Sequence, residues 1–192
     1  MPKLDRRFLF LLASARPSGN TELLARRAAS ALPEGVRQHW LRLAEHPLPP
    51  FVDHRHGSQR FPEPKGVERL LLDATLEATD IVFVTPLYWY SLPSSAKLYR
   101  DYWSAWMRTS DGGFLQWMSG KTTWVVTTVS GENAAAADPM INALRLTADY
   151  ARMRWGGLLV GHGDRPGDVL THAPSLAAAN VLFGEVGSKQ CP

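Results

Sequence analysis

Ala13-Ser-Ala-Arg-Pro-Ser-Gly-Asn-Thr21 is the stretch that decides the fold, because it joins an apolar run to a helix-forming segment. Residues 8–13 have the unbroken apolar character of a strand that is buried on both faces. The residues after Thr21 are mostly good helix formers. A strand, a tight turn and a helix start place backbone N–H groups and the positive end of the helix dipole at one point. This arrangement favours a bound anion.

The side chains of the turn also suit an anion. Ser14, Ser18 and Thr21 offer hydroxyl groups, Asn20 offers an amide, and the Arg16 guanidinium is suited to bidentate contact with phosphate. The alternative is an ordinary surface turn in which Ser18 or Asn20 caps the helix. The turn alone leaves both interpretations open.

Composition indicates one globular domain, residues 1–192, since the chain is 45% hydrophobic and long enough to bury a sizeable core. With 21 basic and 18 acidic side chains and no dense Lys/Arg stripe, we expect no nucleic-acid partner. The single Cys191 excludes an internal disulfide framework and a cysteine-held metal cluster. His54-Arg-His56 offers only two imidazoles in a loop, so no metal site is expected.

The beginning of the chain has some features of an export signal. Arg6-Arg7, the apolar run and Ser14-Ala15 resemble a short secretory or twin-arginine signal, but the run is at the lower length limit for one. Cleavage there would also remove the first strand. No apolar run approaches the ~20 residues that span a bilayer. We therefore expect a cytoplasmic protein without membrane insertion.

Strand-like and helix-like segments alternate, which predicts a parallel α/β sheet covered by helices. Five strands are expected at residues 8–13, 36–43, 80–85, 121–128 and 156–161, and five helices at residues 20–32, 67–79, 93–108, 139–154 and 173–186. The Pro- and His-rich passage 45–65 is expected to be a loop, serving as a lid or an interface arm. Such a sheet binds ligands at the carboxyl ends of its strands. The loops after the first, third and fourth strands should therefore share one site.

The loop after the third expected strand is unusually aromatic. Leu87, Tyr88, Trp89 and Tyr90 would line a flat, mostly apolar ligand, and the backbone N–H groups of residues 87–89 would be free to reach its acceptors. Alternatively, these side chains extend a hydrophobic core with aromatic residues that recur on one face of the following helix. The helical residues, for which a core or a subunit interface is favoured over a ligand site, are Tyr99, Tyr102, Trp103 and Trp106.

Several motifs together are fairly specific. They are Ser14-Ala-Arg16, Ser18-Gly-Asn-Thr21, Thr85-Pro-Leu-Tyr-Trp89, Ala96-Lys-Leu-Tyr-Arg-Asp101 and Gly120-Lys121 before a strand. At this spacing they resemble flavodoxin-like NAD(P)H-dependent FMN reductases and quinone reductases. The resemblance covers essentially the whole chain. It implies a flavodoxin-like three-layer sandwich whose five-stranded parallel sheet has the order 2-1-3-4-5.

The resemblance also implies a cofactor site. The FMN phosphate would be bound by Ser14, Arg16, Ser18, Asn20 and Thr21. The isoalloxazine and ribityl chain would contact Pro86, Leu87, Tyr88 and Trp89, and the other edge of the ring would approach Ser130, Gly131 and Glu132. A single glycine follows the fourth strand where relatives often have several, and Tyr90 replaces a residue that is often small. No catalytic triad or dyad is found, and Tyr88 is the candidate accessory donor.

The activity implied is hydride transfer from NAD(P)H through bound FMN to a quinone or similar small acceptor, by a ping-pong route. The absence of Walker and Rossmann motifs fits this interpretation. A homodimer or dimer of dimers is implied, with the aromatic helix as a candidate seam and the loop 45–65 covering the neighbour's flavin. The alternative is a flavodoxin-like electron carrier without its own nicotinamide-dependent activity. A pI near 9.2 disfavours it, because such carriers tend to be acidic.

Overall fold

The protein is built around a parallel five-stranded sheet with the order β2-β1-β3-β4-β5. The structure, a computed structural model, describes residues 5–109, 113–131 and 133–186. The strands are β1 (Arg7–Leu12), β2 (Arg37–Arg42), β3 (Asp80–Val84), β4 (Thr122–Val129) and β5 (Arg154–His162). The predicted strand order and parallel direction are confirmed.

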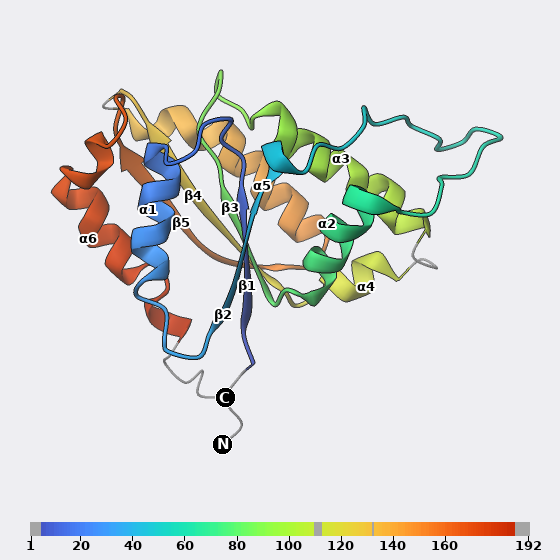
Figure 1. The fold of residues 1–192 in the computed structure, drawn as a ribbon, viewed down its shortest axis with the longest axis horizontal. Helices are drawn as coiled ribbons and strands as arrows, with labels where there is room; N and C mark the ends of the chain where they lie inside the picture. The colour runs from blue at the N-terminus through green and yellow to red at the C-terminus, as the bar shows by residue number, and fades with distance from the viewer. Residues whose placement is uncertain (1–4, 110–112, 132, 187–192) are drawn as a thin grey trace.

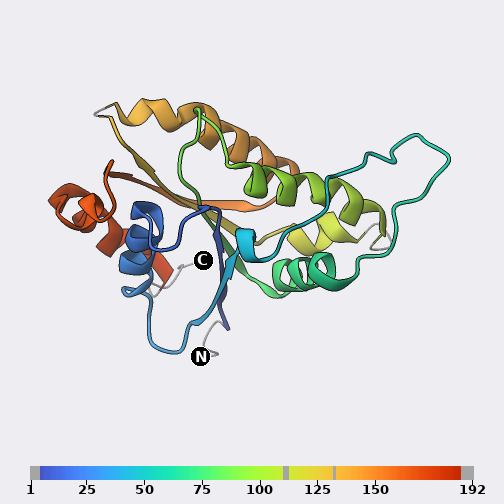
Figure 2. The same cartoon turned by 45° about the horizontal axis from the view of Figure 1, so that its top comes forward.

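Helices cover both faces of the sheet and make the predicted three layers (Figures 1 and 2). One face is covered by α1 (Asn20–Ala29) and α6 (Ala173–Val181). The other is covered by α2 (Gly66–Glu77), α3 (Ser94–Thr109), α4 (Phe114–Met118) and α5 (Asp138–Tyr150). Between the short turn Leu43–Glu45 and α2, the chain forms no regular element, as predicted for the Pro-rich loop.

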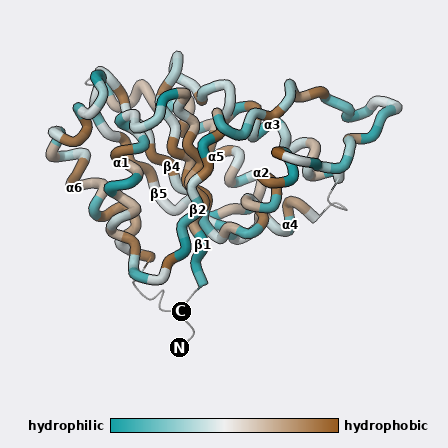
Figure 3. The backbone as a smooth tube through the Cα atoms, viewed as in Figure 1, coloured by the Kyte–Doolittle hydropathy of each residue, from teal (hydrophilic) through white to brown (hydrophobic). Residues whose placement is uncertain are grey.

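The core lies on the two faces of the central strands, where hydrophobic residues concentrate (Figure 3). Along β1, Phe8 and Phe10 pack in the cluster beneath α1 and α6, whereas Leu9 and Leu11 belong to the cluster on the opposite face. This alternation follows from the two-residue period of a strand. The continuous apolar run of the sequence is thus explained by burial on both sides.

The helix predictions were wrong in four places, the first of which is the end of α1 at Ala29 instead of residue 32. The described residues contain six α-helices rather than five, because the short α4 follows Gly113 and was not predicted. The last helix ends at Val181, and residues 184–186 form a separate 3-10 turn. Helix α5, predicted at residues 139–154, ends at Tyr150, because Arg154 already begins β5. The spacing of apolar residues along the sequence did not indicate these helix boundaries.

The end of α5 has a physical explanation. Arg152 adopts a left-handed conformation with φ +54°, and the Met153 N–H donates to the carbonyl of Ala148 at 2.8 Å. This is the geometry of a helix C-cap that glycine usually provides. Since an arginine occupies the position, the sequence carried no glycine to mark the helix end.

The aromatic residues of α3 form part of the core within the chain. Tyr99 and Trp106 are fully buried, and Tyr102 and Trp103 are nearly so. Their rings contact one another and Phe114 of α4 at centroid distances of 5.6–6.4 Å. The core interpretation is confirmed. The hypothesis that these side chains form a subunit seam is wrong, because they are not exposed to a partner.

Asp80 is the centre of a buried polar cluster at the amino-terminal end of β3. Its side chain is 1% exposed and accepts hydrogen bonds from Thr79 Oγ1 at 2.7 Å and Trp124 Nε1 at 2.9 Å. Arg6 forms a bidentate ion pair with the same carboxylate. The cluster ties β1, β3 and β4 together at the edge opposite the predicted ligand loops.

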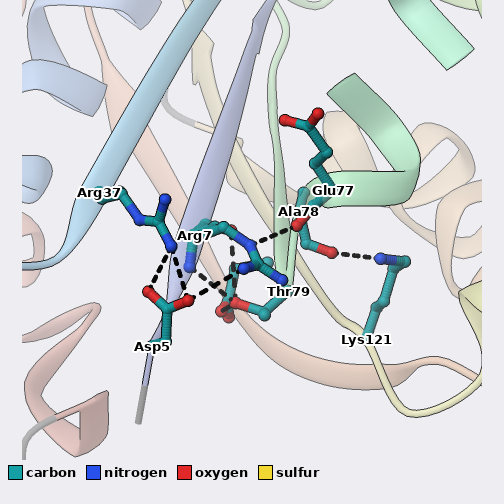
Figure 4. A network of polar contacts seen from close by, with 8 residues as sticks. Asp5, Arg7, Arg37, Glu77, Ala78, Thr79 and Lys121 are labelled. Atoms are coloured by element: carbon teal, nitrogen blue, oxygen red, sulfur yellow. Dashed lines mark hydrogen bonds and ion pairs between the residues drawn. The ribbon is translucent and has the colours of Figure 1, made fainter. Parts of the chain in front are cut away.

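A second polar network lies at the same edge (Figure 4). Asp5 pairs with Arg37 at 2.6 Å and with Arg7 at 3.0 Å, and the Arg7 Nε donates to the carbonyl of Glu77 at 2.6 Å. Lys121 Nζ donates to the carbonyls of Leu76 and Ala78, at the end of α2. Burial lowers the Lys121 pKa to about 8. The ammonium supplies a hydrogen-bond donor to carbonyl groups that the helix leaves unpaired.

Gly156 allows β5 to approach β4 closely. A Cβ at this position would lie 2.4 Å from the Trp124 ring and 2.6 Å from Thr122 Cγ2. We expect Gly156→Ala to lower the free energy of unfolding by about 1–3 kcal/mol, through overpacking of the strand pair. Urea denaturation would show a lower midpoint with an unchanged slope. Gly184→Ala is the matched control, since a Cβ there has nothing within 4 Å. Equal midpoints for both variants would contradict the prediction.

Candidate functional site

Three loops meet at the carboxyl edge of the sheet, at the top of Figure 1. The Ala13 N–H donates to the carbonyl of Val84 at 2.9 Å, which joins the turn after β1 to the end of β3. The hydroxyls of Thr21 and Thr128 lie 2.9 Å apart and join the start of α1 to the end of β4. The loops after β1, β3 and β4 therefore lie together, as the topology predicted.

Helix α1 begins without a side-chain cap. Its N-cap residue is Gly19, with φ −69° and ψ 163°, and no side chain accepts a hydrogen bond at the cap. The alternative in which Ser18 or Asn20 caps the helix is therefore wrong. The first turn of α1 presents backbone N–H groups at the positive end of the helix dipole, which is the environment that an anion requires.

The turn that leads into α1 has a defined conformation. Ser18 is left-handed, with φ +54°, a conformation that costs an L-residue roughly 1–2 kcal/mol. The Ser14 Oγ accepts the Arg16 N–H at 3.1 Å. Ser14 is buried, whereas Arg16 and Ser18 are exposed. The predicted phosphate ligands of this turn thus include an accessible guanidinium beside the uncapped helix start.

Asn20 and Thr21 make contacts that the sequence did not reveal. The Asn20 Nδ2 donates to the carbonyl of Arg165 at 2.9 Å, and its Oδ1 accepts the Gly167 N–H at 2.9 Å. The Thr21 hydroxyl is bonded to Thr128, as described above. Contacts between these side chains and an anion would compete with the observed bonds. The backbone N–H groups of both residues, at the start of the helix, could bind an anion without breaking these side-chain hydrogen bonds.

Glu22 and Arg42 are two site residues that the sequence analysis missed. Glu22 Oε2 accepts the Ser18 N–H at 2.9 Å and lies 2.7 Å from Arg42 Nη2. Burial raises the Glu22 pKa, but the hydrogen bonds from Arg42, Arg26 and Ser18 outweigh it, so the pKa lies below that of a free glutamate. Glu22 occupies the third helical position, where a capping glutamate is common, so a signal existed for it. No sequence signal indicated Arg42, which comes from the end of β2.

The aromatic loop after β3 is a tight turn. Tyr88 and Ser91 exchange two backbone hydrogen bonds, of 3.1 and 3.0 Å, and the two residues between them are left-handed, with φ +49° at Trp89 and +61° at Tyr90. These values describe a type I′ turn, which normally contains Asn or Gly. The Tyr88 N–H is therefore not free for a ligand, contrary to the prediction. Leu87 and Trp89 remain as the candidate backbone donors.

The turn presents aromatic side chains to solvent. Trp89 is 93% exposed, and Tyr88 and Tyr90 are also exposed. Leu87 is half-buried and packs against the core, which anchors the turn. Pro86 is half-buried at its start. Exposed aromatic rings add little to the hydrophobic core. A conformationally costly turn that holds them in solvent is therefore suited to contacting a ligand.

The loop after β4 contributes Ser130 and Gly131, which are both exposed at the same edge. The Gly131 carbonyl lies 3.2 Å from His162 Nδ1 at the end of β5. Glu132, which was expected to approach the flavin, lies outside the described residues. Within the described ranges, no three His, Cys, Asp or Glu side chains gather as metal ligands, and no helix has the length and apolar character to cross a membrane.

This sheet order and edge site define a flavodoxin-type α/β protein. The family model described as "Flavodoxin-like fold" matches residues 6–180, and the chain belongs to this family. The chain is also 30% identical over 170 residues to a Bacillus subtilis (strain 168) protein named "Putative NAD(P)H-dependent FMN-containing oxidoreductase YwqN". The match covers 88% of this chain and 91% of that protein.

Solved structures agree on the fold. The Trp repressor binding protein from Bacillus subtilis is 23% identical, with a TM-score of 0.73, and the match covers 96% of this chain and 99% of that one. The NAD(P)H:quinone oxidoreductase from Methanothermobacter marburgensis is 14% identical, with a TM-score of 0.66 and coverage of 97% and 100%. At these identities the likeness shows the fold alone.

Proposed function

We propose that this chain is an FMN-dependent NAD(P)H oxidoreductase that passes hydride to a quinone or similar small acceptor. The observation that carries the proposal is the uncapped start of α1 beside exposed Arg16, on the same sheet edge as the aromatic turn 88–91. A phosphate and a flat ring joined by a ribityl chain match these two features. The name of the Bacillus subtilis relative supports the same cofactor.

The residues present fit FMN. Its phosphate would be held by Ser14, Arg16, Ser18 and the first N–H groups of α1. Bound FMN would accept a hydride from a nicotinamide and return two electrons to the acceptor. Residues 86–89 would orient the ring and exclude water from one side of it, and residues 130–131 would border its other edge. Tyr88, an exposed residue, would serve as an accessory proton donor through its hydroxyl.

The visible spectrum of the purified protein tests the proposal directly. We expect flavin absorption bands that bleach when NADPH or NADH is added without oxygen, and that return when a soluble quinone is added. Comparing the two nucleotides at equal concentration would show which one the enzyme prefers. A colourless protein that does not take up added FMN would contradict the proposal and indicate a flavodoxin-like binding module.

An electron carrier is the competing function. Such a protein would bind FMN but would accept electrons only from a reductase partner. Steady-state oxidation of NAD(P)H by the purified protein with a soluble quinone distinguishes the two functions. Turnover without a partner protein supports the oxidoreductase, and reduction that requires a reductase supports the carrier.

We further propose a cytoplasmic homodimer or dimer of dimers in which the loop 45–65 covers the flavin of the neighbour. This loop extends away from the body of the molecule (Figure 2) and is anchored at its base by the Tyr102 hydroxyl, which donates to the Pro49 carbonyl at 3.1 Å. A cytoplasmic location is proposed because cleavage of a signal after the apolar run would remove β1. Light scattering that shows a fully active monomer would contradict the proposed assembly.

A further inference from the structure

Glu22 and Arg42 together hold both sides of the turn that precedes α1. The Glu22 side chain is 5% exposed, and its Oε2 accepts the Ser18 N–H at 2.9 Å. Arg42 Nη2 donates to the same oxygen at 2.7 Å, and Arg42 Nη1 donates to the Arg16 carbonyl at 3.4 Å. The pair therefore contacts the turn at Arg16 and at Ser18, on either side of Pro17. We call this pair the Glu22–Arg42 clasp.

The sheet positions the clasp. Arg42 is the last residue of β2 and pairs with Leu12, the last residue of β1, from which the turn departs. The Arg42 side chain is 13% exposed, so it is held in place by its surroundings. Glu22 lies on the first turn of α1. The clasp thus connects the turn to β2, an element that contributes no predicted ligand residue of its own.

The clasp stabilises a turn whose backbone conformation is unfavourable. Ser18 is left-handed, a conformation that is unfavourable for any residue with a Cβ, and Gly19 provides no side-chain cap. In a capping box, the glutamate at the third helical position reaches the N–H of the N-cap residue. Here it reaches the N–H of Ser18, one residue earlier. The carboxylate thereby stabilises the turn without occupying the N–H groups at the helix start.

The charge of Glu22 is compatible with a nearby anion. Arg26 donates to Glu22 Oε1 from Nε at 3.0 Å and from Nη2 at 2.8 Å, while Arg42 pairs with Oε2. Arg42 Nε also lies 3.2 Å from Glu45 Oε1, so two guanidinium groups balance two carboxylates. The paired charge of Glu22 therefore does not oppose an anion at the helix start.

We propose that Glu22 and Arg42 are positioning residues that hold residues 14–19 in the conformation that binds the phosphate of FMN. The inference rests on the proposed function. It predicts selectivity for FMN over riboflavin, which has the same ring and ribityl chain but lacks the phosphate. Loss of the clasp should weaken phosphate recognition and leave contacts to the ring unchanged.

Flavin fluorescence titrations of the apoprotein with FMN and with riboflavin measure this selectivity. We expect Arg42→Met and Glu22→Gln each to weaken FMN binding about 10-fold and to leave riboflavin binding within about 2-fold, consistent with loss of charge-assisted hydrogen bonds. Arg42→Lys should restore part of the FMN affinity. The matched control is Arg26→Met, which removes the ion pair on the other carboxylate oxygen and should change the selectivity less than about 3-fold.

The outcomes separate the clasp from the proposed function. Selectivity that is unchanged in both clasp variants overturns the inference. So does an equal loss of FMN and riboflavin affinity, because it would indicate general damage to the fold. A wild-type protein that binds neither flavin overturns the proposed function together with the clasp. Should Glu22→Gln fail to fold, the Arg42→Met and Arg42→Lys pair gives the same test, since Glu22 then keeps its bonds to Arg26 and Ser18.

Discussion

Asp80→Ala is expected to lower the free energy of unfolding by about 3–5 kcal/mol, the range found when one partner of a buried ion pair is removed. The Asp80 side chain is 1% exposed and is the acceptor for Arg6, Thr79 and Trp124. Alanine would leave these donors without their acceptor in a region with little access to water. Because buried polar groups without partners are costly, the loss should exceed that of any single apolar contact nearby.

Urea denaturation followed by far-UV circular dichroism measures this loss as a lower midpoint with an unchanged slope. Asp80→Asn should fall between the wild type and Asp80→Ala, since the amide keeps an acceptor oxygen but loses the charge. Asp5→Ala is the matched control. It breaks exposed ion pairs to Arg37 and Arg7 and should leave the midpoint nearly unchanged. A loss below about 1 kcal/mol for Asp80→Ala would show that the cluster is not a main source of stability.

Arg16→Ala should weaken FMN binding by about 10- to 100-fold, which corresponds to the roughly 1.5–3 kcal/mol of a hydrogen bond between charged groups. Arg16 is exposed beside the uncapped start of α1, where its guanidinium would complement a phosphate. Because the site is accessible to solvent, the difference between wild type and variant should shrink at high ionic strength.

Fluorescence titration at low and high salt checks both expectations. Riboflavin affinity should be unaffected, since the lost contact is to the phosphate. Arg27→Ala, which removes an equal charge from the exposed last turn of α1, is the control and should change FMN affinity little. FMN retention that does not differ between Arg16→Ala and the wild type would refute the phosphate role of Arg16.

The sequence was sufficient to predict the sheet and the position of its ligand edge. Continuous apolar runs such as those of β1 and β3 indicate burial on both faces, and the alternation with helices predicts parallel strands. The order of the strands was implied by the resemblance to flavodoxin-like reductases. The end of α5 could not be predicted, because its left-handed cap is Arg152 rather than glycine. The short α4 has too few residues for a helical period to be detected.

Only part of the candidate site could be predicted, because several of its contacts join residues that are far apart in the sequence. Ser14, Arg16 and Ser18 are local to one turn, so their proximity follows from the sequence. The partners of Asn20 lie more than 140 residues away in the sequence, and those of Glu22 include Arg42, from the end of β2. Long-range hydrogen bonds of this kind leave no local pattern. Similarly, nothing in the composition of residues 88–91 indicates a type I′ turn, because its central positions are Trp89 and Tyr90.

The two hydrogen bonds of Asn20 have a consequence for the synthesis of the protein. Its side chain is held by Arg165 and Gly167, and the neighbouring Thr21 is held by Thr128. On the ribosome, the first turn of α1 emerges long before any of these partners. The start of α1 therefore gains the hydrogen bonds that hold Asn20 only after β5, the last strand, has left the exit tunnel. A nascent chain that stops before β5 should be unable to retain the cofactor.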